Sequence, residues 1–137
     1  MLTNADITLY SRRMNLQTKQ AGYISLVIEH VSWYSSCDVT AVAGGLVSSD
    51  TYRIRIPEKA FIDGKPALDG YLSPSDYQAE PEGHWTVENG DYFCLGKGPE
   101  IDKPSDLGKY HLIYGQVRSL RDNRRGGLPH IRIEGWR

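Results

Sequence analysis

The sequence is poor in the features that mark disulfide-stapled, exported and membrane-spanning proteins. Only two cysteines occur, Cys37 and Cys94. They could form one bridge, but a reduced, buried pair fits a cytosolic protein better. No window approaches the ~20 apolar residues needed to span a bilayer, and the first ten residues contain neither a basic leader nor an apolar signal core. We therefore expect a soluble chain with no membrane partner and no export signal.

An excess of charge of one sign is also missing, because 16 basic side chains oppose 17 acidic ones. A polycation that would favour nucleic acid is therefore absent from the sequence. The charge is unevenly distributed, however. Residues 58–106 contain eleven acids and four lysines, whereas residues 118–137 contain six arginines and two acids. Such opposite patches suit self-assembly, although chance clustering on a solvated surface explains them equally well.

Motifs for catalysis and metal binding are scarce. No two of the four histidines (His30, His84, His111 and His130) are three or four residues apart, and none has a cysteine at a short spacing. A zinc site is therefore poorly supported. The sequence contains no G-x-S-x-G, and no G-K-[ST] follows Gly44-Gly45. We expect no enzymatic activity, no catalytic residue, no metal and no cofactor.

Two kinds of residue deserve separate interpretation. Asp91 follows the turn dipeptide Asn89-Gly90, and we expect its carboxylate to hold the local backbone. Trp33, Trp85 and Trp136 could stack on nucleic-acid bases. Tryptophans at strand ends are more often core or interface anchors, which is the interpretation we favour.

Nine tyrosines, three tryptophans and 14 glycines indicate β structure with many turns. Tyr52, Ile54 and Ile56 alternate with Arg53 and Arg55, which predicts a strand with its apolar side chains inward and its arginines outward. Strands are predicted at residues 6–11, 23–34 (buried on both faces in its first half), 37–43, 51–56, 85–88, 91–95, 111–122 and 128–134, and a loop at residues 12–21.

One short helix is expected where Ser73 can cap and Pro74 fits the first helical position, and it must end before Pro81. Long helical periods and internal repeats are absent from the sequence. Short strands at this spacing favour an all-β fold, an antiparallel barrel or sandwich, in a single domain over residues 1–137.

The last two predicted strands enclose a basic loop, and we interpret them as an arm that reaches another molecule. Asn123, Arg124 and Arg125 lie in the loop, and Arg121 and Asp122 lie at its entrance. The two loop arginines could contact phosphates. They could equally pair with carboxylates of a neighbouring subunit. These five residues are the first set of candidate interface residues.

Five segments, in chain order, resemble small head–tail joining proteins of long-tailed phages and prophages of Gram-positive bacteria. They are residues 7–12 (ITLYSR), 30–34 (HVSWY), 51–57 (TYRIRIP), 85–96 (WTVENGDYFCLG) and 122–135 (DNRRGGLPHIRIEG). Together they span most of the chain, and VENGDY with DNRRGGLPHIRI is the most specific pair.

The resemblance implies a stopper-like protein of the virion neck, assembled in the host cytoplasm. Such proteins are small β-barrels with extended loops that form a ring of about six copies with cyclic symmetry. The ring would lie between the portal or adaptor proteins and the tail-terminator or tail-tube proteins. It would close the DNA channel after packaging, let genomic double-stranded DNA pass without reading its sequence, and offer a docking surface to the tail.

The resemblance also leads us to expect one long loop that points into the channel or up to the adaptor. Residues 42–50 and 62–83 are the two candidates. We favour residues 62–83, because this segment is long and includes Tyr71 and Tyr77, which complete the candidate interface. An ordinary loop folded over the barrel is an equally good interpretation.

Three alternatives stay open. The first is a tail-terminator or tail-completion ring protein, although terminators typically have longer helices flanking a sheet. The second is an OB-like barrel that binds single-stranded nucleic acid. It needs basic and aromatic side chains on one face, yet Tyr52 is predicted to point away from Arg53 and Arg55. The third is an enzyme, which ranks last.

Overall fold

A computed structural model describes residues 3–15, 20–110 and 112–137. Almost all of the regular structure in these residues is β. The strands are β1 (Ala5–Asn15), β2 (Gln20–Val42), β3 (Gly45–Pro57), β4 (Phe61–Ile62), β5 (Lys65–Pro66), β6 (Tyr92–Leu95), β7 (Tyr114–Asp122) and β8 (His130–Trp136). A 3₁₀ turn, η1 (Leu68–Gly70), and two short helices, α1 (Pro74–Ala79) and α2 (Ser105–Lys109), complete the fold.

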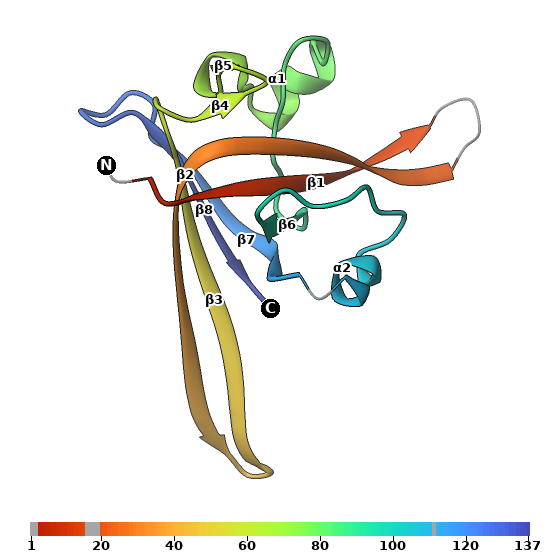
Figure 1. Ribbon diagram of the computed structural model, residues 1–137, viewed down its shortest axis with the longest axis vertical. Helices are drawn as coiled ribbons and strands as arrows, with labels where there is room; N and C mark the ends of the chain where they lie inside the picture. The colour runs from red at the N-terminus through yellow and green to blue at the C-terminus, as the bar shows by residue number, and fades with distance from the viewer. Residues whose placement is uncertain (1–2, 16–19, 111) are drawn as a thin grey trace.

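Six of these strands form a closed antiparallel barrel, which confirms the predicted fold class. Their order is β1-β6-β7-β8-β3-β2, and β2 pairs with β1 to close the sheet. The small β4–β5 hairpin is attached to β2 through Glu29 and Phe61. Because β2 is 23 residues long, it bends from one side of the barrel to the other and pairs with β1 in its first half and β3 in its second (Figure 1).

The barrel interior is filled by alternate residues of its strands. Ile54 and Ile56 of β3 face Ile133 and Ile131 of β8, and all four side chains are fully buried. Burying each such side chain contributes about 1.5–3 kcal/mol. The ring of Phe93 lies among other aromatic rings of the core, and its centroid is 5.7 Å from Tyr52 and 5.8 Å from Trp33.

Local predictions based on caps and turns are confirmed. The Ser73 hydroxyl accepts a hydrogen bond from the backbone N–H of Asp76 at 3.5 Å, and Pro74 is the first residue of α1. Asn89-Gly90 forms a turn in which Gly90 has a φ of 96°, a conformation that glycine adopts without steric cost. Gly45 (φ 122°) follows the turn between β2 and β3.

The main errors concern how far the strands extend. Residues 37–43 are not a separate returning strand but the continuation of β2. The predicted loop at 12–21 is also largely wrong, since Arg12 pairs with Tyr23 and the ladder continues to Asn15 and Gln20. Residues 16–19, and His111 at the start of a predicted strand, lie outside the described residues. Cross-strand backbone pairing makes these residues part of β1 and β2, although their side chains lack the apolar alternation that would predict a strand.

Other corrections are smaller. Residues 85–88 make only an isolated bridge, between Trp85 and Tyr71, and α2 was not predicted. Cys37 is exposed instead of buried, and neither Cys37 nor Cys94 forms a disulfide. Ile24 is 53% exposed, so the first half of β2 is not covered on both faces.

Candidate interaction surfaces

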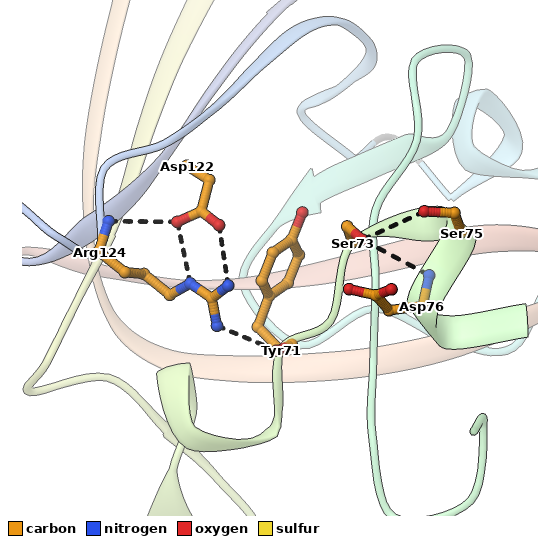
Figure 2. A network of polar contacts seen from close by, with 6 residues as sticks. All are labelled: Tyr71, Ser73, Ser75, Asp76, Asp122 and Arg124. Carbon is orange, nitrogen blue, oxygen red and sulfur yellow. Dashed lines mark hydrogen bonds and ion pairs between the residues drawn. The ribbon is translucent and has the colours of Figure 1, made fainter. Parts of the chain in front are cut away.

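The tip of the β7–β8 hairpin is folded back onto the protein through Arg124 (Figure 2). The guanidinium group of Arg124 donates from Nε and Nη2 to the two carboxylate oxygens of Asp122, at 2.9 and 2.8 Å. Its Nη1 donates to the backbone oxygen of Tyr71 at 3.1 Å. The guanidinium carbon also lies 4.8 Å from the centroid of the Tyr71 ring, which is cation–π geometry.

This network changes the proton affinities of its members. Hydrogen bonds from Arg124 lower the pKa of Asp122 below its usual value, and the pKa of Arg124 is raised by the same contact. Burial raises the pKa of Tyr71. The carboxylate and the guanidinium group are therefore charged partners of each other.

Tyr71 belongs to the core, not to the surface that we predicted for it. Its side chain is only 2% exposed and its ring makes an edge contact with Trp85, with the centroids 5.0 Å apart. Trp85 in turn donates from Nε1 to the backbone oxygen of Ala67 at 2.8 Å. The ring of Tyr71 therefore offers no exposed surface to a partner, whereas Tyr77, on α1, is half-buried.

Three other predicted interface residues, Arg121, Asn123 and Arg125, are neighbours of this network in the chain. Asn123 pairs with His130 across the hairpin, where its backbone N–H donates to the His130 carbonyl at 2.9 Å. Arg125 is exposed at the tip, and Arg121 is exposed on β7. The structure thus brings Tyr71, Asp122 and Arg124 together in one network.

The longest projection of the molecule is the end of the β2–β3 hairpin, which we call the arm and define as residues 36–50 (Figure 1). Strand β8 reaches along β3 only as far as Thr51, and β1 reaches along β2 only as far as Val31. Within the described residues the arm is therefore a two-stranded ribbon without a third strand. Its strands pair in register to the turn, where Val42 faces Gly45.

The arm exposes apolar side chains that the barrel does not cover. Val39, Val42 and Leu46 are 61%, 50% and 77% exposed. An isolated two-stranded ribbon is marginally stable in water, and its free edges can pair with another chain. The arm therefore has the properties of a surface that is completed by a partner. In the sequence its clearest signal was the pair of β-rich runs on either side of Gly44-Gly45.

A second surface, the arginine face, lies on the outside of the barrel and consists of Arg53, Arg55, Arg121 and Arg132. Arg55 of β3, Arg132 of β8 and Arg121 of β7 are direct cross-strand neighbours, so three like charges form one row. Arg53 lies two residues from Arg55 on the same outer side of β3.

Glu134 lies beside this row and pairs with two of its arginines. It accepts a hydrogen bond from Arg132 and lies 3.9 Å from Nε of Arg53. Tyr34 pairs with Arg53 on the neighbouring strand and is 63% exposed. On the other margin Arg118 lies 4.9 Å from the ring of Trp136.

The described residues contain no group of three or more His, Cys, Asp or Glu side chains that could hold a metal ion. Asp91 has the structural role predicted for it, since its Oδ2 accepts hydrogen bonds from the Ser11 hydroxyl at 3.1 Å and from the Glu88 N–H at 2.9 Å. Burial raises the pKa of the Cys94 thiol, which makes it a poor nucleophile. Neither helix of the described residues is long and apolar enough to cross a bilayer.

Comparison with known proteins places the chain in one family. The chain belongs to DUF6751, a family of unknown function, whose model matches residues 2–136. No curated protein and no solved structure matches the chain. The DUF6751 match includes both the barrel and the arm, so the two are covered by one family model.

Proposed function

We propose that this DUF6751 protein is a structural subunit of a phage neck. Copies of it form a ring, of about six subunits, between the portal or adaptor proteins and the tail. The ring closes the DNA channel after packaging and gives the tail a surface on which to dock. Two observations agree with this role: the chain is a small β-barrel, and the segments that resemble head–tail joining proteins lie mainly on its strands.

The observation that carries the proposal is the arm. It extends from a closed barrel and exposes Val39, Val42 and Leu46. Past Asp50, whose carbonyl accepts a hydrogen bond from the Arg137 N–H, neither of its strands pairs with a third strand within the described residues. A ribbon of this kind gains stability by packing against neighbouring subunits. A ring subunit with a central channel provides such neighbours on both sides.

The arm also replaces residues 62–83 as our candidate for the loop that reaches the channel or the adjoining ring. Residues 62–83 contribute Ala67, Leu68 and Tyr71 to the core, so much of this segment is held against the barrel. The arm tip, by contrast, lies farthest from the barrel in Figure 1. We therefore propose that the arm makes the contacts that were first assigned to residues 62–83.

A nucleic-acid-binding barrel is the second candidate, because one observation favours it. Tyr52 points inward, as predicted, but Tyr34 and Trp136 share the outer side of the barrel with the arginine face. Basic and aromatic side chains are therefore interleaved on one surface. Binding of single-stranded DNA that weakens steeply with salt would support this candidate. The tail-terminator alternative has less support, since α1 and α2 have six and five residues.

Deletion of the gene, followed by electron microscopy of the lysate, tests the proposed function. We expect filled or leaking heads beside free, finished tails, because the joint between them is missing. Supplying the intact chain from a plasmid should restore complete particles, which controls for effects on neighbouring genes. Normal virions after deletion would contradict the neck assignment.

A further inference from the structure

The arginine face holds more positive charge than its own chain neutralises. Directly opposed cross-strand residues lie about 4.5–5.5 Å apart, and like charges at that distance destabilise a sheet. The row of Arg55, Arg132 and Arg121 nevertheless crosses three adjacent strands. Within the described residues Glu134 is the carboxylate that forms ion pairs with this face, through Arg53 and Arg132. Arg55 and Arg121, at the two ends of the row, form none there. An external anion would relieve this repulsion.

The same chain carries a segment of opposite charge, residues 66–96, which we call the acidic segment. It contains six acids, of which Asp91 is buried, and no lysine or arginine. Asp76, Glu80 and Glu82 are exposed on and after α1, and none of the three forms an ion pair with another described residue. In Figure 1, α1 lies at the end of the molecule opposite the arm tip.

We propose that the arginine face of one copy binds the acidic segment of a second copy. The inference rests on the proposed ring and names the contact between its subunits. The two surfaces belong to different elements, so the contact is head-to-tail, the kind that closes into a ring. Arginine pairs with carboxylates through two parallel hydrogen bonds, which gives the contact a defined geometry.

A second copy fits the arginine face better than nucleic acid does. Glu134 lies within the face and repels phosphate, whereas a protein partner can place a neutral or donor group beside it. The acidic segment would also repel a polyanion that approached the chain from its α1 end. Both features disfavour a continuous polyanion, whereas the carboxylates of the acidic segment are spaced along a protein chain and can approach the arginines without lying beside Glu134.

Sedimentation velocity of charge-reversed variants tests the contact. Variant A carries Arg55→Glu and Arg121→Glu, and variant B carries Glu80→Arg and Glu82→Arg; all four side chains are exposed. The native chain should associate in about 50 mM salt and dissociate in about 500 mM salt, where the Debye length falls to a few Å. Each variant alone should bind itself at least tenfold more weakly than the native chain does.

An equimolar mixture of variants A and B is the decisive sample. The face of variant A is now acidic and can bind the segment of variant B, which is now basic. The native arginine face of variant B can bind the native acidic segment of variant A. Association should therefore return to within about threefold of the native affinity, which a loss of folding cannot imitate. As a matched control, Lys59→Glu with Lys65→Glu changes the charge equally outside the face and should not weaken association.

Several results would overturn the contact. They are a native chain that stays monomeric at both salt concentrations, variants that associate like the native chain, or a mixture that stays dissociated. Thermal unfolding checks each variant, and Arg55→Gln with Arg121→Gln replaces variant A if that protein unfolds. A fluorescent single-stranded DNA that binds the native chain but not variant A, with association unchanged, would assign the face to nucleic acid. Leaking heads after gene deletion would still support the neck role in each of these cases.

Discussion

The β7–β8 hairpin and the β2–β3 hairpin of the barrel use the residues near their turns in opposite ways. The β7–β8 tip contains Arg124, which binds Asp122 and the backbone of Tyr71 within the same chain. The β2–β3 arm carries Val42 and Leu46, which remain exposed. The charged tip is therefore part of the folded body, whereas the apolar arm is left without a partner. A charged loop is not by itself an interface, because its guanidinium group can bind a carboxylate and an aromatic ring of the same chain.

The largest difference between the two hairpins should appear when a large side chain is removed beside each. Tyr71→Ala deletes a ring that is 2% exposed and supports Arg124, and should lower the free energy of unfolding by about 3–4 kcal/mol. Leu46→Ala at the arm tip should lower it by less than about 0.5 kcal/mol. Urea denaturation measures both values. Equal losses would show that the arm is part of the cooperative core.

Two glycines make the same comparison with a smaller expected effect. A Cβ at Gly135, inside the barrel, would lie 2.4 Å from Cε1 of Phe93 and 2.7 Å from the backbone oxygen of Gln116. Gly135→Ala should therefore lower the free energy of unfolding by about 2–3 kcal/mol. Gly44→Ala, in the arm turn, meets no described atom within 4 Å and should change it by less than about 0.5 kcal/mol. A stable Gly135→Ala protein would mean that the barrel is looser than described.

The charged tip itself should contribute about 1 kcal/mol to folding. Arg124→Ala removes the pair with Asp122 and the contact with Tyr71, whereas Arg125→Ala removes an exposed side chain and serves as the control. The sequence alone assigns both arginines to a contact with another molecule. The structure now predicts a lower thermal midpoint for Arg124→Ala alone. Identical midpoints for the two variants would restore the first interpretation.

The smallest effect concerns pH. Because Arg124 lowers the pKa of Asp122 in the folded state, the pair stabilises the protein above the ordinary carboxylate pKa and loses this contribution as the pH falls through the folded value. The Asp122 side chain is 40% exposed, so the contribution should stay below about 1 kcal/mol. Asp122→Asn should lower the thermal midpoint at pH 7 but not in strong acid. A difference that persists in acid would contradict an ionic origin.

Much of the barrel could be predicted from the sequence, because its signals are local. Alternation at Tyr52, Ile54 and Ile56 predicted which face of β3 is buried, and Ser73-Pro74 predicted the start of α1. The extent of β2 could not be predicted in this way. Its continuation past Cys37 depends on pairing with β3, which runs from Ser32 and Arg55 to the turn. A local sequence pattern does not show which strand a residue will pair with.

The candidate surfaces were harder to predict than the fold. Tyr71 resembled a loop residue because its sequence neighbours are turn formers, yet long-range packing against Trp85 buries it. The arginine face was visible only as two outward residues, Arg53 and Arg55, until the strand order placed β7 and β8 beside β3. Cross-strand neighbours separated by some 70 residues in the sequence give no local signal.

Shortening the arm tests most directly whether the barrel folds by itself while the arm serves assembly. Ser36 and Thr51 are register partners, so an Asn-Gly turn can join them in place of residues 37–50 and leave the pairing of β3 with β8 intact. We predict a shortened chain whose thermal midpoint lies within a few degrees of the native value, but which yields no tailed particles when it replaces the native chain in the deletion strain. Complete, infectious particles made with the shortened chain, or a collapse of its thermal midpoint, would contradict that division of roles.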